Sequence, residues 1–139
     1  MSAFDLDLLT AKAASIERHL RRVETTLAKQ QGDLNPGSDA SDAIVLHLWQ
    51  AVQLTMDLAF AASSHLNLPA AATYGDAFRN CAREGTIDGL LAQRLVQSTG
   101  FRNAIAHAYE ELDRDLVLKT ASSGPADLRR FLAAMAALA

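Results

Sequence analysis

The sequence predicts an all-α protein. Apolar residues recur at steps of three and four along most of the chain, which is the spacing of amphipathic helices. No segment alternates between apolar and polar residues as a strand does, and no internal repeat is visible. A chain of 139 residues, 50% of them hydrophobic, is long enough for one buried core and short for two. We therefore expect a single helical domain over residues 1–139.

The first long helix is predicted from an apolar seam whose steps alternate between four and three residues. The seam consists of Leu9, Ala13, Ile16, Leu20, Val23 and Leu27. The other face carries the basic residues Lys12, Arg18, Arg22 and Lys29. The seam is expected to face other helices. Residues 32–42, GDLNPGSDASD, gather glycine, proline, asparagine and serine, and are expected to end this helix.

The second long helix, over residues 42–66, is predicted to be central and largely buried, because its apolar residues lie on more than one side. One stripe contains Val45, Leu48 and Val52, and another contains Ile44, Ala51, Leu54 and Leu58. Polar residues follow a further stripe, consisting of His47, Gln50, Gln53 and Asp57. This polar stripe is either a narrow solvated face or the wall of a groove or subunit contact.

Two shorter helices are predicted next. Pro69 is expected to close the second helix. Thr73 and Thr86 are candidate N-caps of the two shorter helices, and Gly85 is a candidate stop between them. Gly100 is expected to interrupt or bend the run that follows.

The C-terminal part of the chain is expected to contain two further helical segments. Asp113 is a candidate cap for a helix that begins in ELDRDLVLKT. Serine, glycine and proline at residues 123–125 predict a break. A final helix then carries the apolar residues Leu128, Phe131, Leu132 and Met135.

Composition excludes several classes of function. The net charge of −3 and pI near 5.7 give no global basic field, so any contact with RNA must come from a local patch. The single Cys81 allows no intrachain disulfide and gives no zinc signature. The chain has no glycine-rich phosphate loop, no GxSxG elbow and no HExxH motif. We expect no metal site and no cofactor.

The chain is expected to be cytoplasmic and to lack a membrane segment. The N-terminal residues MSAFDLDLLT are acidic where a signal peptide is basic. The longest uncharged stretch, residues 58–75, contains His65, Asn67 and Pro69, which a bilayer span tolerates poorly.

The segment FRNAIAHAYEELD, residues 101–113, is the candidate functional site. On an uninterrupted helix, Arg102 and Tyr109 share a face, and Asn103 and His107 lie on the adjoining stripe. One interpretation is a helix C-terminus with a histidine near the negative end of the dipole. The other is chemistry on RNA. An imidazole, whose ordinary pKa lies near neutrality, can take the proton of a 2′-hydroxyl group, and a guanidinium can stabilise charge on phosphorus.

That chemistry favours a dimer. Each chain offers one histidine in this segment, His107, whereas separate acid and base groups work better than one. A symmetric dimer with the two segments facing each other would supply two histidines and two arginines.

The segment resembles a known motif. FRNAIAHAY is similar to the motif of HEPN-domain proteins, in which four to six residues separate an arginine from a histidine and a tyrosine follows two positions later. Here four residues separate Arg102 from His107, and Tyr109 follows. Three further segments resemble the HepT subfamily, in the same order: IERHLRRVE, DAIVLHLWQAVQLTMDLAF and LNLPAAATYGDAF. The resemblance covers about residues 10–120.

The resemblance implies an antiparallel helical bundle with two long N-terminal helices, a homodimer, and the toxin of a type VII toxin-antitoxin pair that cleaves RNA without a metal. Arg102 and His107 correspond to the catalytic pair, and Asn103 to a residue that orients its neighbours. Tyr109 corresponds to the tyrosine to which an MntA-like minimal nucleotidyltransferase antitoxin attaches AMP. Asp57 matches an acidic position of the second helix and is expected to be a groove or interface residue.

Two other functions stay open. The chain could be a non-catalytic HEPN module that engages a nucleotidyltransferase partner, nucleotide or RNA. The acidic pI favours this alternative, because ribonucleases profit from basic surfaces. The third option is a structural helical adaptor in which the motif occurs by chance.

Overall fold

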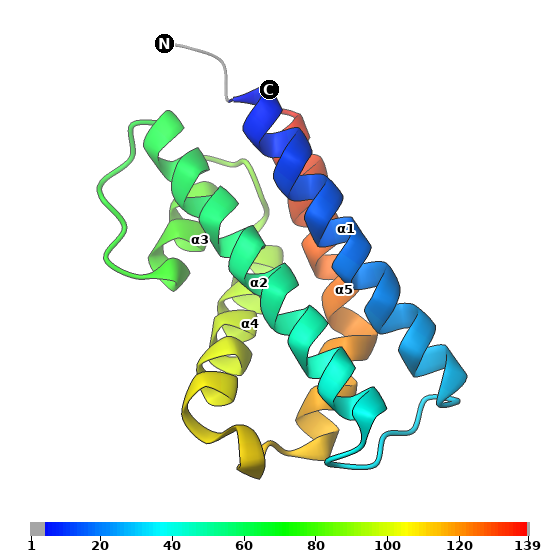
Figure 1. Cartoon of the computed structure of the whole chain (residues 1–139). Helices are drawn as coiled ribbons and strands as arrows, with labels where there is room; N and C mark the ends of the chain where they lie inside the picture. Colours follow the sequence, from blue (N-terminus) through cyan, green and yellow to red (C-terminus); the bar gives the residue numbers. More distant parts are fainter. Residues whose placement is uncertain (1–4, 139) are drawn as a thin grey trace.

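A computed structural model describes residues 5–138 and confirms the all-α prediction (Figure 1). Within that range there are five α-helices, one short 3-10 helix and no strand. In chain order the elements are α1 (Leu6–Lys29), α2 (Asp39–His65), α3 (Tyr74–Arg83), α4 (Gly89–Ala108), η1 (Tyr109–Glu111) and α5 (Arg114–Ala136). The two long N-terminal helices are therefore present as predicted, and α5 is a third long helix.

Helix α2 is the centre of the bundle. It contacts α1, α3, α4 and α5, and its two predicted apolar stripes are buried except for the half-buried Leu54. In Figure 1, α1 and α5 lie on one side of α2, and α3 and α4 lie on the other. By length and composition alone α2 could cross a bilayer. Its packing against four other helices instead accounts for its apolar character.

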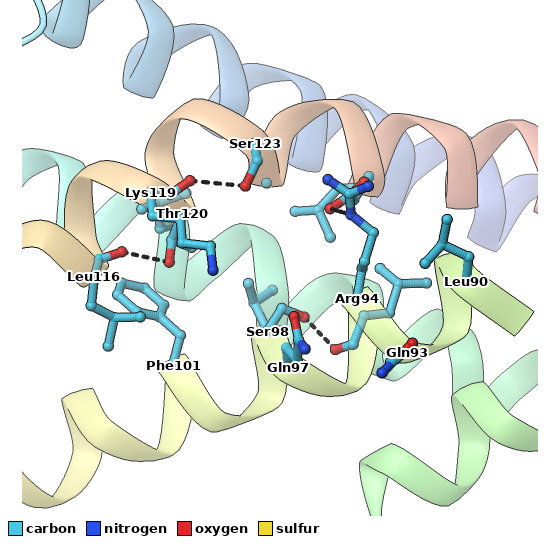
Figure 2. Close-up of a pocket in the computed structure, with 16 residues that line it drawn as sticks. Leu90, Gln93, Arg94, Gln97, Ser98, Phe101, Leu116, Lys119, Thr120 and Ser123 are labelled. Carbon is cyan, nitrogen blue, oxygen red and sulfur yellow. Dashed lines mark hydrogen bonds and ion pairs between the residues drawn. The ribbon is translucent and has the colours of Figure 1, made fainter.

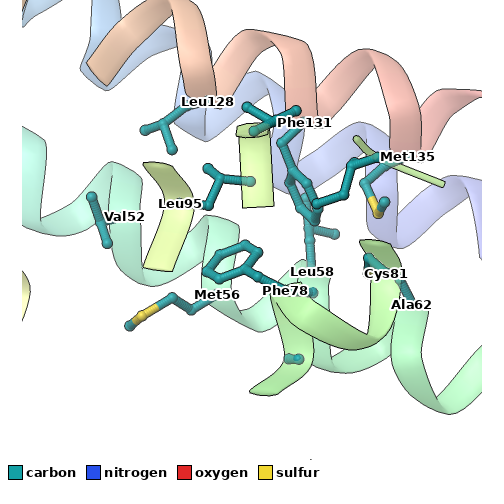
Figure 3. Close-up of a cluster of buried hydrophobic side chains, with 14 of the residues drawn as sticks. Val52, Met56, Leu58, Ala62, Phe78, Cys81, Leu95, Leu128, Phe131 and Met135 are labelled. Carbon is teal, nitrogen blue, oxygen red and sulfur yellow. The ribbon is translucent and has the colours of Figure 1, made fainter. Parts of the chain in front are cut away.

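Two hydrophobic clusters form the interior. The larger cluster joins the first half of α1 to the second half of α2, to α3, to the first half of α4 and to the end of α5. Figure 3 shows its aromatic centre, where Phe78 of α3 meets Phe131 of α5 edge to face, with ring centroids 5.4 Å apart. The second cluster places Leu48 of α2 with Phe101 and Ile105 of α4. The second cluster therefore anchors the helix that carries the candidate site.

Helix ends follow local chemistry, with one correction. Thr73 caps α3 by accepting from the backbone N–H of Asp76, and Asp113 caps α5, as the sequence predicts. The prediction that Thr86 caps the next helix is wrong. Helix α4 begins at Gly89, and the Asp88 carboxylate accepts from the Leu91 N–H at 2.7 Å.

The physical reason for this shift is burial. Ile87 is only 5% exposed and belongs to the larger cluster, so the chain enters the core before the helix begins. Two other local signals mark helix ends. Gly85, with φ of +75°, stops α3 as predicted. Asn67 takes the left-handed conformation with φ of +54°, and α2 ends at His65, ahead of Pro69.

Neither Gly100 nor residues 123–125 interrupts its helix, so the predicted break at 123–125 is wrong. Helix α4 continues through Gly100, and α5 runs unbroken from Arg114 to Ala136 with Pro125 inside it. A proline within a helix removes one backbone hydrogen bond. Helix α5 tolerates this loss because its buried residues form one continuous stripe: Val117, Ala121, Pro125, Leu128, Phe131 and Met135. The packing of this stripe against the other helices therefore outweighs the local effect of the proline.

An ion-pair network joins α5 to α1. Arg129 donates to Glu17 at 2.9 Å and to Glu24 at 2.6 Å. The hydrogen bonds from Arg129 hold the pKa of both carboxyls below their usual range. The charge of Glu17 is thereby compensated on the outer face of α1.

We expect Leu48→Ala to lower the free energy of unfolding by about 3 kcal/mol, because Leu48 is fully buried and its truncation leaves a cavity beside Phe101 and Ile105. Leu46 on the same helix is 49% exposed, so Leu46→Ala is the matched control and should change stability by less than about 0.5 kcal/mol. Urea unfolding followed by circular dichroism measures both. Equal losses would show that α2 does not face the core as described.

Candidate functional site

The candidate motif lies at the C-terminal end of α4. Phe101 and Ile105 are buried in the second cluster, which fixes this part of the helix against α2. Ala104 and Ala108 are half-buried on the same side of the segment. Asn103 and His107 are exposed.

Arg102 and Asn103 are in direct contact. Arg102 Nη1 donates to Asn103 Oδ1 at 3.3 Å, so Asn103 is placed to hold one edge of the guanidinium. Arg102 is half-buried, and its Nε is enclosed without a hydrogen-bond acceptor within residues 5–138. A buried donor of this kind calls for an explanation in a native protein, since most are satisfied. Because Nε is shielded from solvent, an external anion can reach this guanidinium only through its terminal nitrogens.

His107 is exposed on the last turn of α4. Its imidazole is open to solvent, unlike the half-buried His19 and His47. On an ideal helix, residues five positions apart point about 140° away from each other, so Arg102 and His107 do not lie on one stripe. One chain therefore presents the two groups separately.

The structure corrects the position expected for Tyr109. Helix α4 ends at Ala108, whose φ of −150° and ψ of 49° break the helix, and Tyr109 opens η1. The helical spacing that placed Tyr109 on the face of Arg102 therefore does not apply. Tyr109 instead turns toward α2, and its hydroxyl donates to the carboxylate of Asp42. The tyrosine stays accessible, with 39% of its surface exposed.

Asp42 changes the chemistry of Tyr109. The hydrogen bond to this carboxylate, followed by partial burial and the negative charges of Asp42 and Glu110, raises the pKa of Tyr109 to about 12. The two residues line a small cavity of about 70 Å³ together with Arg114. Arg114 holds the α1–α2 loop there, because its Nε donates to the carbonyl of Leu34 at 2.6 Å. Arg114 also pairs with the carboxylate of Asp33 in the same loop.

Sequence reasoning did not single out Asp42. The residue lies 67 positions before Tyr109, and the acidic first turn of a helix gives it a sufficient local explanation. Only the fold brings the two residues together, so no local pattern could have identified the pair.

Asp57 lies away from the motif. It accepts from Gln53 at 3.2 Å and pairs with Lys12 of α1 at 3.7 Å, and Gln53 also contacts the hydroxyl of Tyr74. None of these contacts involves Arg102 or His107. The polar stripe of α2 thus packs partly against neighbouring helices, and a supporting role for Asp57 stays a prediction.

A separate cavity of about 380 Å³ lies between α4 and α5 (Figure 2). Inside it, Arg94 donates to the buried Asp127 at 3.2 Å. Neither Arg102 nor His107 lines this cavity. Phe101 is the one residue of the segment 101–113 that lines it.

Within residues 5–138, no group of three or more His, Cys, Asp or Glu side chains could hold a metal ion. His19 and His47 do meet, with their Nδ1 atoms 2.9 Å apart. Burial first, and then neighbouring positive charge, lowers the pKa of both imidazoles. Cys81 is buried, and burial raises the pKa of its thiol to about 11, which makes it a poor nucleophile.

The chain is similar to known proteins in both sequence and fold. A curated mRNA nuclease HepT from Shewanella oneidensis is 23% identical over 126 residues, covering 91% of this chain and 94% of the relative. The fold matches a tri-AMPylated HEPN toxin of the same organism, solved in complex with an MNT antitoxin, with a TM-score of 0.86 and 23% identity over 96% and 99% of the two chains. A cytosolic Bacillus subtilis protein of unknown function, YutE, matches with a TM-score of 0.70 and 14% identity over 98% and 92%.

These matches confirm the helical bundle predicted from the resemblance. The family model described as ribonuclease HepT-like matches residues 16–135, which include all five α-helices in whole or in part and the complete motif segment. The chain belongs to the HepT-like ribonuclease family.

Proposed function

We propose that this protein is the toxin of a HEPN/MNT toxin-antitoxin pair and acts, as a single helical domain in the cytoplasm, as a metal-independent endoribonuclease. The observation that carries the proposal is the family match over residues 16–135 together with the Arg102–His107 motif at the end of α4. Support comes from the similar mRNA nuclease and from the similar toxin solved with its MNT antitoxin.

The proposed reaction uses the 2′-hydroxyl group of RNA as the nucleophile. The neutral imidazole of His107 takes the hydroxyl proton, and the 2′-oxygen forms a bond to the adjacent phosphorus. The bond from phosphorus to the 5′-oxygen breaks, and that oxygen takes a proton from an imidazolium. The products are a 2′,3′-cyclic phosphate and a 5′-hydroxyl. Arg102 stabilises the charge that develops on the phosphoryl oxygens.

A homodimer completes this site. A single chain supplies one histidine in the motif, and it presents Arg102 and His107 on different sides of the helix. The partner's His107 would protonate the leaving oxygen while this chain's His107 acts as the base.

Neutralisation is proposed to occur by AMPylation of Tyr109 by an MntA-like nucleotidyltransferase antitoxin. The Tyr109 oxygen attacks the α-phosphorus of ATP, pyrophosphate leaves, and Asp42 accepts the hydroxyl proton that it already binds. Arg114 lies in the same cavity and can pair with the new phosphate. The adenylate would place negative charge and bulk two residues from His107, where the RNA backbone must pass.

We expect His107→Ala to reduce RNA cleavage at least about 100-fold, because it removes the proposed acid and base. Cleavage of a fluorogenic RNA in EDTA is the assay. Gln97 is exposed on the same helix, so Gln97→Ala is the matched control and should cleave normally. Since His107 is exposed, the thermal unfolding of both variants should match that of the unmodified protein. Full cleavage by His107→Ala would remove this residue from the mechanism.

A second prediction concerns modification. Incubation with ATP and a cognate nucleotidyltransferase should raise the intact mass by one or more adenylates, and Tyr109→Phe should abolish the gain. Tyr74 is the other tyrosine of the chain, so Tyr74→Phe is the control and should keep the full gain. The same mass gain in Tyr109→Phe would place the modification elsewhere.

A further prediction concerns the pKa of the Tyr109 hydroxyl. Asp42→Asn should lower the pKa of Tyr109 from about 12 toward 10, because the carboxylate both accepts a hydrogen bond from the neutral phenol and repels the phenolate. Titration of the phenolate absorbance in a Tyr74→Phe background isolates Tyr109. An unchanged pKa would mean that the two side chains are not in contact.

A further inference from the structure

A basic groove runs along the outer face of α1, where α1 meets the start of α2. We name it the α1–α2 groove. Its volume is about 680 Å³, and its cationic lining consists of Arg18, Arg21, Arg22 and Lys29. Of the described residues 5–138, Glu17 is the only one with a carboxylate that lines the groove. Since the whole chain carries a net charge of −3, this concentration of positive charge is local.

The groove cations are largely free of acidic partners. Arg18 and Arg22 lie one turn apart, and neither forms an ion pair with any residue in the range 5–138. Glu17 is already engaged, because Arg129 donates to it at 2.9 Å and Arg21 at 3.3 Å. The lowered pKa of the nearby His47, caused by burial and then by Arg22 and Arg18, agrees with a positive local field.

The dimensions and chemistry of the groove suit an extended polyanion. Arg18 and Lys29 are eleven residues apart on one helix, which separates them by about 16 Å along its axis. Guanidinium groups bind phosphate oxygens in a bidentate manner, and the hydroxyls of Thr25 and Thr26 add neutral donors. Among residues 5–138, no Phe, Tyr or Trp lines the groove, so this part of the chain offers no aromatic surface on which bases could stack. These residues can contact a phosphate backbone, and such contacts carry no sequence preference.

The groove adjoins the proposed catalytic region. Ala43 and His47 of α2 line the groove, and Asp42, the partner of Tyr109, directly precedes Ala43. The end of α4, the start of α2 and the end of α1 lie at the same end of the bundle, the lower end in Figure 1. A strand that passes the motif can therefore continue over the start of α2 into the groove.

We propose that the α1–α2 groove binds the phosphate backbone of single-stranded RNA and holds the substrate strand beyond the bond that His107 cleaves. This inference rests on the proposed ribonuclease function. It supplies the local basic patch that an acidic chain needs in order to bind RNA. Binding through Arg18 and Arg22 is sequence-independent and weakens as salt rises.

The test compares two double variants that each remove two positive charges. Arg18→Gln with Arg22→Gln alters the groove, and Arg83→Gln with Lys119→Gln alters exposed cations elsewhere. Both are made in a His107→Ala background, so that labelled single-stranded oligouridine stays intact during fluorescence anisotropy. The groove variant should bind at least tenfold more weakly at low salt. Its slope of log K against log salt should be shallower by about 1.4, or about 0.7 for each lost phosphate contact. The charge-matched control should bind like its parent.

Equal affinities of the two double variants for RNA would overturn the groove proposal. In that case, RNA cleavage by the protein with His107 intact would show that the ribonuclease function still stands. A protein that neither binds nor cleaves RNA would overturn both. If the groove variant loses the nucleotidyltransferase partner while its RNA affinity is unchanged, the groove is a surface for an acidic protein and the proposal is wrong. Circular dichroism melting of both variants confirms that each is folded.

Discussion

The burial of α2 on several sides is the constraint on which the rest of the molecule depends. Because this helix is apolar around most of its circumference, the other four helices must cover it, and every one of them does. The cluster around Leu48 then fixes the end of α4 through Phe101 and Ile105. Those two contacts determine which way the neighbouring polar residues point. The placement of Arg102 and His107 is thus a consequence of how α4 packs against α2.

The same helix also organises the polar side of the site. Its first turn contributes Asp42, which accepts a hydrogen bond from the hydroxyl of Tyr109. The next residue, Ala43, lines the α1–α2 groove. The proposed cleavage, regulation and RNA contact therefore meet at one end of the bundle. An adenylate on Tyr109 would alter charge at the point where a bound strand crosses α2. The proposed regulation would therefore require no unfolding.

Local sequence signals predicted those features that local chemistry decides. The caps Thr73 and Asp113 could be identified because an N-cap needs only a side-chain oxygen near the first turn. The position of Pro125 inside a helix could not be predicted from its sequence neighbours, because the helix continues there through the packing of the buried stripe of α5. The turn that separates Tyr109 from α4 and the contact with Asp42 depend on the tertiary fold. The reaction itself was inferred from the resemblance, because helical spacing cannot distinguish a catalytic histidine from a solvated one.

The chemistry of the RNA ends tests the central claim most directly. If a 2′-oxygen is the nucleophile and His107 moves the protons, the products formed in EDTA must carry 2′,3′-cyclic phosphate and 5′-hydroxyl ends. Mass spectrometry of a short defined RNA, cleaved by the purified protein, resolves these ends. Products with 3′-hydroxyl and 5′-phosphate ends, or cleavage that requires a divalent metal, would contradict the account.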